Sequence, residues 1–153
     1  MARLPRRPRA SVLASYGLPV STKLLLHTFG GQDSTTLLGS LASASLPPGW
    51  SCITTAASAL PGRLPPGFLP AKPGEYIPDL VAAASAVLGK TGYGTVSECL
   101  ATGTPLVYVP RRHFAEEPFL VRLLDSRGCC LEMSRAAYEA GDWGGALERA
   151  VDG

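Results

Sequence analysis

The chain has 153 residues, of which 46% are hydrophobic and 17% are charged. This length and composition suit one globular domain with a sizeable core, and they exclude a chain that is disordered throughout. The net charge of +2 gives no reason to expect a basic face for nucleic acid, because much of the positive charge comes from Arg3, Arg6, Arg7 and Arg9 in the N-terminal segment.

Residues 1–20 form a basic, Pro-rich lead-in and a helix, and we expect the domain itself to occupy residues 21–153. The lead-in contains no acidic residue, as is typical of transit peptides, but its apolar stretches are too short for a secretory signal. We expect a solvated tail on a cytoplasmic protein, with plastid or mitochondrial targeting as the alternative. No window approaches the ~18 apolar residues of a membrane span, so no membrane span is expected. Nucleic acid is not expected as a partner either, because the positive charge is concentrated in the lead-in.

Apolar runs typical of buried strands alternate with stretches typical of helices along the rest of the chain. The expected strands are residues 23–29, 50–56, 86–89, 105–110 and 129–133, and the expected helices are residues 76–86, 94–103, 116–128 and 140–151. Strands of this kind separated by helices predict an α/β domain, Rossmann-like, with a mostly parallel sheet covered on both faces. Trp50, Phe68 and Trp143 are expected in its core.

Three loops are expected to share one edge of this sheet, because parallel strands bring their carboxyl ends together and ligands bind there. They are FGGQ after the first strand, KTGYGT after residues 86–89, and PRRHFAEE after residues 105–110. In the last of these loops, His113 is a candidate contact for a phosphate or a sugar. His27 lies in an apolar strand, so we interpret it as a core histidine, not as a base.

The tripeptide GKT in the second loop resembles part of a Walker phosphate loop. That motif requires glycine at position 84, where this chain has Ala84, so we interpret Lys90 as an accidental match. With two histidines far apart and no Cys/His cluster at ligand spacing, no metal site is predicted. The four cysteines are interpreted as buried thiols.

The sequence GYGTVS in the same loop is closer to the G-x-G-x-x-[GA] fingerprint, with Ser97 in the third small position. Gly92 and Gly94 would let the backbone approach a diphosphate at a helix N-terminus. Thr95 either donates a hydroxyl to that ligand or only caps the helix, and both interpretations stay open. Arg111 and Arg112, about 20 residues further on, allow an alternative in which the ligand is NADP.

The segments FGGQ, LPPGW, residues 76–120 and LEMSRAAYEAGDW together resemble the glycosyltransferase-like N-terminal region of plant-type L-arabinokinases. The likeness covers nearly everything from Ser11 to the C-terminus. More distantly, GYGTVSE followed by a proline-bounded strand and an acidic pair is similar to the donor-binding half of GT-B glycosyltransferases, including the bacterial lipid-linked N-acetylglucosaminyltransferases. The resemblance implies the C-terminal Rossmann-like half of a GT-B fold.

The resemblance also implies a site for a UDP-sugar, with no other cofactor. Gly92, Gly94 and Thr95 would face the diphosphate, with Tyr93 in the same loop, and Glu98 would accept hydrogen bonds from the ribose hydroxyls. The remaining residues of the implied site are Gly30, Gly31, Arg112, His113, Glu116 and Glu117, of which the two glutamates occupy the place of sugar-binding Asp-Gln or Gln-Gln pairs. No catalytic residue is assigned.

Two departures argue against a complete glycosyltransferase. The related patterns have Asp just before the strand where this chain has Ala86, and acids replace the sugar-binding amide, although that replacement is itself similar to arabinokinases. More seriously, the resemblance implies that the acceptor-binding N-terminal half is missing. Neither the phosphate loop nor the kinase domain of the resembled family occurs in the sequence. We therefore expect a nucleotide-sugar-binding half-domain whose partner is a second Rossmann half or a sugar kinase domain. The alternatives are a noncatalytic docking module of a sugar kinase and an NADP-dependent oxidoreductase fragment.

Overall fold

The computed structural model of the chain describes residues 3–28, 43–55, 64–110, 117–128 and 130–152. Its centre is a sheet of six parallel strands in the order β3-β2-β1-β4-β5-β6. The strands are β1 (Lys23–Thr28), β2 (Trp50–Thr54), β3 (Phe68–Pro70), β4 (Ala86–Gly89), β5 (Leu106–Tyr108) and β6 (Cys130–Glu132). This is the order of the doubly wound Rossmann fold.

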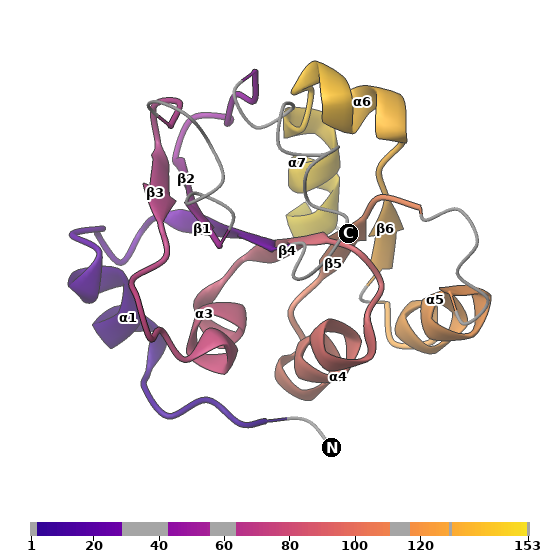
Figure 1. Ribbon diagram of the computed structural model, residues 1–153, viewed down its shortest axis with the longest axis horizontal. Helices are drawn as coiled ribbons and strands as arrows, with labels where there is room; N and C mark the ends of the chain where they lie inside the picture. The colour runs from indigo at the N-terminus through magenta and orange to yellow at the C-terminus, as the bar shows by residue number, and fades with distance from the viewer. Residues whose placement is uncertain (1–2, 29–42, 56–63, 111–116, 129, 153) are drawn as a thin grey trace.

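Helices cover both faces of the sheet (Figure 1). The helices α1 (Arg9–Ser15), α3 (Ile77–Ala83), α4 (Tyr93–Thr102) and α5 (Glu117–Asp125) lie on one face, and α6 (Arg135–Ala140) and α7 (Gly144–Asp152) lie on the other. Strand β1 supplies both cores, because successive side chains of a strand point to opposite faces. Leu24 and Leu26 pack with α1, α3 and α4, while Leu25 packs with α7.

An aromatic cluster fills the core beneath α6 and α7. The ring of His27 stacks on Tyr138 and Trp143, with centroid separations of 6.0 and 5.6 Å, and Phe68 meets Trp143 edge to face. His27, Phe68, Trp143 and the nearby Trp50 are all buried. The prediction that these four side chains belong to the core is therefore confirmed.

The five predicted strands are present, as are the four predicted helices and the helix predicted within residues 1–20, most of them with shifted ends. In the described part of the chain, two short elements were not predicted. Strand β3 lies between residues 56 and 76, where neither a strand nor a helix was expected, and it tolerates Pro70 because it is at the edge of the sheet. Helix α6 is six residues long, between the N-cap Ser134 and Gly141, whose φ of 76° is left-handed. Six residues are too few for an apolar period to stand out.

None of the helices in the described part of the chain is long and apolar enough to cross a membrane. Cys52 and Cys99 are buried thiols, as expected, whereas Cys130 is only half-buried and Cys129 lies outside the described residues.

Candidate functional site

The candidate site lies where β4 leads into α4. Strand β4 pairs with β1 on one side and β5 on the other, and β1 continues to β2 and β3 in the opposite direction across the sheet. Chain connections diverge at such a reversal, and ligands of doubly wound folds bind in the crevice that this leaves at the carboxyl ends of the strands. Residues 90–92 therefore occupy the topological switch point of the sheet.

The glycines of the GYG segment are not required by the fold. Gly92 is the N-cap of α4 with extended backbone (φ −112°), and Gly94 follows in the first turn. A Cβ atom added to either residue would meet no atom within 4 Å from other parts of the described residues. By contrast, a Cβ on Gly89 would lie 2.3 Å from the backbone oxygen of Thr28. Gly89 is thus needed for strand packing, while Gly92 and Gly94 leave backbone open to the surroundings.

Backbone N–H groups are available beside these glycines, since the first N–H groups of a helix have no acceptor within it. The intrahelical bonds of α4 begin with the N–H of Val96, which donates to the carbonyl of Gly92 at 2.9 Å. Because the N-cap is Gly92 and no side chain caps the helix, the interpretation of Thr95 as a helix cap is wrong. Tyr93 projects outward and is 58% exposed.

Glu98 lies one turn further along α4, and its residue is only 4% exposed. Its carboxylate is already paired: the Nε and Nη2 atoms of Arg3 donate to the Glu98 Oε1 atom at 2.9 and 2.6 Å. A charge-assisted pair of this kind is stronger than a bond between neutral groups. Sequence reasoning missed this partner.

Residues 3–8, which we call the N-terminal arm, run along the outside of α3 toward α4 (Figure 1). The backbone N–H groups of Arg6 and Arg7 donate to Oδ1 of Asp79 at 2.6 and 3.1 Å, and the Arg7 side chain donates to Asp79 and Glu75. The Arg6 guanidinium lies 3.9 Å from the ring centroid of Tyr76. The expectation of a solvated tail is therefore wrong, because carboxylates on α3 and beside it hold the arm in place.

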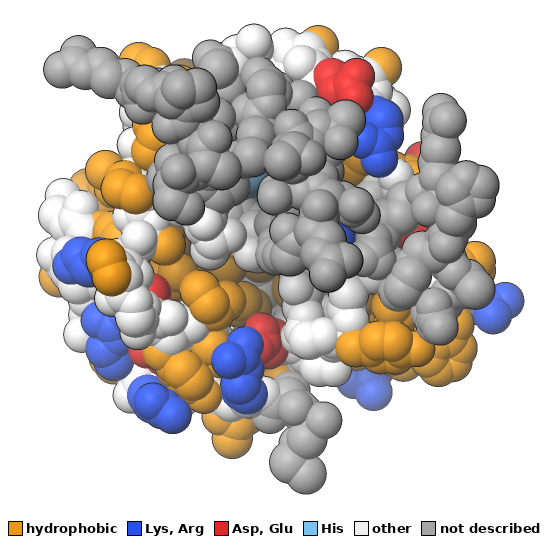
Figure 2. All heavy atoms as spheres, in the orientation of Figure 1, with side chains coloured by type: hydrophobic (Ala, Val, Ile, Leu, Met, Phe, Trp, Pro, Cys, Tyr) orange, Lys and Arg blue, Asp and Glu red, His pale blue; other side chains and the backbone are white. Residues whose placement is uncertain are grey.

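Asp79 is the main anchor of the arm. Burial by itself would raise the pKa of this carboxyl group, but the hydrogen bonds from Arg6 and Arg7 outweigh burial and lower the pKa below its ordinary value. Basic and acidic side chains lie next to each other at the lower left of Figure 2, along the side of the molecule that the arm follows. The anchoring is electrostatic, so it depends on residues 75 and 79 carrying their charges.

Glu117 begins α5 and lies next to the glycine loop. The hydroxyl of Thr91, which is fully buried, donates to the Glu117 Oε1 atom at 2.6 Å. This bond joins the loop after β4 to the helix that follows β5, so two of the three predicted loops are in contact. Thr91 was not singled out from sequence, although its place directly before the N-cap glycine is the signal that would have found it. The other predicted site residues, namely Gly30, Gly31, Arg112, His113 and Glu116, and Arg111 with them, lie outside the described residues.

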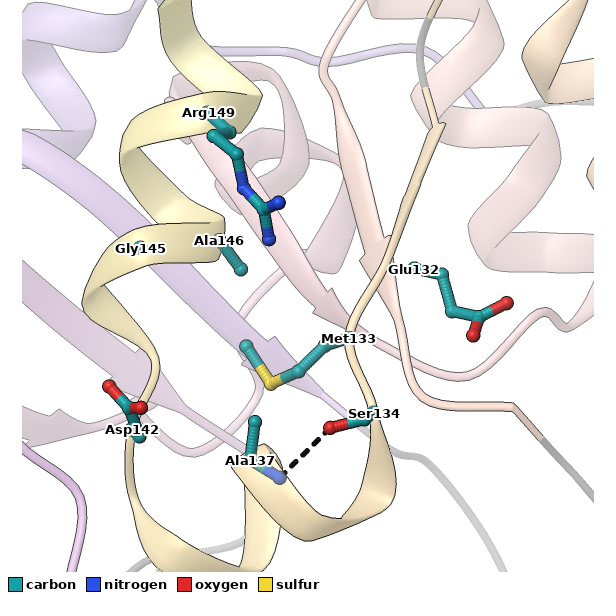
Figure 3. Close-up of a pocket in the computed structure, with 8 residues that line it drawn as sticks. All are labelled: Glu132, Met133, Ser134, Ala137, Asp142, Gly145, Ala146 and Arg149. Atoms are coloured by element: carbon teal, nitrogen blue, oxygen red, sulfur yellow. Dashed lines mark hydrogen bonds between the residues drawn. The ribbon is translucent and has the colours of Figure 1, made fainter.

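A pocket of about 370 Å³ opens elsewhere, at the carboxyl end of β6 beside α6 and α7 (Figure 3). Its polar lining includes Glu132, Asp142 and Arg149, and Met133 lies between them. The strand β6 is two strands away from β4, and α7 covers the other face of the sheet from α4. This pocket is therefore separate from the candidate site. Within the described residues, no three His, Cys, Asp or Glu side chains form a group that could hold a metal ion.

Comparison with known proteins identifies similar sequences and folds. No protein-family model matches the chain. The chain is 40% identical to L-arabinokinase of Arabidopsis thaliana over 151 residues, which are 99% of this chain and 14% of that protein. The resemblance to L-arabinokinase that the sequence indicated is therefore confirmed, and the chain spans only a small part of this relative.

Solved glycosyltransferases share the fold at lower identity. The calicheamicin glycosyltransferase CalG4 has a TM-score of 0.68 and 23% identity over 99% of this chain and 36% of its own. SnogD from Streptomyces nogalater has a TM-score of 0.64 at 20% identity, covering 97% of this chain and 37% of its own. VinC, solved in complex with DTDP, has a TM-score of 0.66 at 18% identity, covering 99% of this chain and 37% of its own. These enzymes are GT-B glycosyltransferases, so the predicted fold class is confirmed.

Proposed function

We propose that this chain, which is similar to L-arabinokinase and has the fold of GT-B glycosyltransferases, is a nucleotide-sugar-binding half-domain. One observation carries the proposal: α4 begins at the switch point of the sheet with two glycines that the fold does not require. Glycine in a helix costs about 1 kcal/mol relative to alanine. A ligand that must approach the backbone closely would explain why position 94 is glycine, whereas packing within the described residues does not explain it.

The ligand that fits this arrangement is a nucleoside diphosphate joined to a sugar, with UDP as the proposed nucleotide. Its diphosphate would accept hydrogen bonds from the N–H groups at the start of α4, where the helix dipole adds about 0.3–1 kcal/mol per charge. Glu98, one turn away, would accept hydrogen bonds from the ribose hydroxyls. Tyr93 is exposed beside the same turn and is proposed to contact the ligand.

The sugar is proposed to lie near the start of α5, where Thr91 holds Glu117 beside the glycine loop. The residues proposed to complete this part of the site are Gly30, Gly31, Arg112, His113 and Glu116. Within this proposal, residues 21–153 are the binding domain, and transfer of the sugar would need an acceptor-binding Rossmann half from elsewhere. A sugar kinase domain is the other proposed partner, since L-arabinokinase is the similar protein and the chain spans 14% of it.

The arrangement is less suited to NADP. A dinucleotide fingerprint follows the first strand of a Rossmann sheet, whereas GYGTVS follows β4. Titration calorimetry with UDP, UDP-glucose, UDP-arabinose, TDP, ATP and NADP separates these ligands. Saturable binding of the uridine ligands supports the proposal, and binding of NADP alone contradicts it.

Gly94→Ala should separate the needs of the ligand from the needs of the fold. We expect the free energy of unfolding to rise by up to about 1 kcal/mol, because the new methyl group clashes with none of the described residues and alanine favours the helix. We expect the affinity for UDP to fall about tenfold or more, since a steric clash with the ligand costs ~1–3 kcal/mol. Urea unfolding and calorimetric titration measure the two effects.

Gly145→Ala is the matched control for this substitution. Gly145 lies near the start of α7, it is exposed, and a Cβ there also meets no atom within 4 Å. We expect a similar gain in stability with no change in the affinity for UDP. If Gly94→Ala left the affinity for UDP unchanged, the diphosphate would not lie at this helix.

A further inference from the structure

The Glu98 carboxylate has two different partners in the arrangement described above. In the free chain it accepts two hydrogen bonds from the Arg3 guanidinium, both at its Oε1 atom. In the proposed complex the same carboxylate would accept hydrogen bonds from the ribose. The two ribose hydroxyls would use both carboxylate oxygens, and Oε1 already accepts both guanidinium bonds, so the ribose and Arg3 cannot both be fully bound at once.

The N-terminal arm has a firmly held part and a lightly held tip. Arg6 and Arg7 make three hydrogen bonds to Asp79 and one to Glu75, and Arg9, where α1 begins directly after the arm, donates to the backbone carbonyls of Ala83, Val20 and Thr22. The tip, residues 3 and 4, has the Arg3 bonds to Glu98, the Arg3 guanidinium 5.9 Å from the Tyr76 ring centroid, and one bond from the Tyr76 hydroxyl to the carbonyl of Leu4 at 2.9 Å. The tip can therefore leave α4 while the rest of the arm stays bound to α3.

Exposure also differs between the two ends of the Arg3–Glu98 pair. The Arg3 side chain is 59% exposed, whereas the Glu98 side chain is 6% exposed. Arg3 thus covers the Glu98 carboxylate. When the Arg3 side chain moves away, water can hydrogen-bond to its guanidinium. Because the Arg3 side chain is open to solvent, a ligand that offers Glu98 other donors can displace this cover.

We propose that the N-terminal arm is a built-in competitor of the nucleotide, with Arg3 occupying the carboxylate that receives the ribose. This inference rests on the proposed function. The arm lowers the affinity of the resting chain for nucleotide, and nucleotide binding releases its tip from α4. Anything that draws the arm away from Glu98 raises the affinity of the site.

Arg3→Ala tests the competition directly. We expect the affinity for UDP and for uridine to rise by the same factor, about 3- to 10-fold, because the ligand no longer has to displace the guanidinium; a tenfold rise corresponds to about 1.4 kcal/mol. Arg122→Ala is the control, since it removes the same charge from the exposed side of α5. We expect it to leave both affinities unchanged. Titration calorimetry at one ionic strength measures all of these values.

Uridine carries no phosphate, so its response distinguishes competition from phosphate binding. If Arg3→Ala lowered the affinity for UDP but not the affinity for uridine, Arg3 would bind the diphosphate and the inference would be overturned. Unchanged affinities, with UDP still bound by the wild type, would also overturn it while leaving the proposed function intact. If neither the wild type nor any variant bound nucleotide, the proposed function itself would fail, and this inference with it.

Release of the tip has a readout that does not depend on affinity. Trypsin cleaves after arginine, and mass spectrometry follows cleavage of the bond between Arg3 and Leu4. We expect saturating UDP to accelerate this cleavage in the wild type, and Glu98→Ala to accelerate it without any nucleotide. Cleavage that is equally fast in wild type and Glu98→Ala, with and without UDP, would show that Glu98 does not hold the arm.

Discussion

Lowering the pH from 7 to 4 should reduce the free energy of unfolding by about 3 kcal/mol, because His27 must remain neutral in the folded chain. Its Nδ1 atom lies 2.9 Å from the Thr54 hydroxyl and its Nε2 atom lies 2.7 Å from the Tyr138 hydroxyl, beneath α6 and α7. Burial lowers the pKa of His27 from 6.5 to about 4. Each pKa unit corresponds to about 1.4 kcal/mol, which gives the expected size.

The direction of this effect follows from proton binding by the unfolded chain. Below pH 6.5 the unfolded chain takes up a proton at His27, while the folded chain does so only below about pH 4. The contribution to stability is therefore complete above pH 6.5 and is lost as the pH falls from 6.5 to about 4. Asp79 acts in a lower pH range. Because its pKa is lowered in the folded chain, its ionised carboxylate stabilises the fold above pH 3.8, and this contribution is lost as the pH falls below that value.

Urea unfolding at intervals between pH 7 and pH 4 measures the slope. His27→Gln should remove most of the slope, because its amide can still donate and accept hydrogen bonds but does not titrate. His113→Gln removes the other histidine of the chain and should leave the slope in place. A slope that survives His27→Gln would assign the acid sensitivity to other groups.

The parts of the fold that sequence predicted are those with strong local signals. Residues 23–29 and 86–89 are apolar runs between glycines and turns, and Gly103 ends α4 in the left-handed conformation expected of a helix C-terminus. The edge strand β3 has three residues and a proline, so its place comes from pairing with β2, not from its own composition. The conformation of such segments is decided by tertiary contacts.

The candidate site was predictable to a similar degree. The glycine loop is local, so its position between a strand and a helix could be predicted from the sequence. The Arg3–Glu98 pair joins residues 95 positions apart, and no local pattern identifies such a partner. A run of arginines among prolines is typical of a solvated segment, and the acidic groups that bind this one, Glu75, Asp79 and Glu98, are spread over α3, α4 and the loop before α3. Their convergence is visible only in three dimensions.

Glu98→Ala is expected to weaken UDP binding about 10- to 100-fold, the largest effect that we expect on the proposed site. The substitution removes the acceptor of the ribose hydroxyls, and hydrogen bonds to a charged group contribute about 1.5–3 kcal/mol. The fold should tolerate the change, because the Arg3 side chain that it leaves behind is already largely exposed. Titration calorimetry with UDP measures the loss, and urea unfolding checks stability.

Glu139→Ala is the control for the lost charge, since Glu139 is exposed on α6, on the other face of the sheet, and its removal should leave UDP binding unchanged.

The double variant carrying both Arg3→Ala and Glu98→Ala tests the two proposals together. If Arg3 acts only by covering Glu98, then Arg3→Ala should tighten UDP binding in the wild type and have no effect once Glu98 is alanine. Equal effects of Arg3→Ala in both backgrounds would mean that the arm influences the ligand through its charge alone, without competing for Glu98.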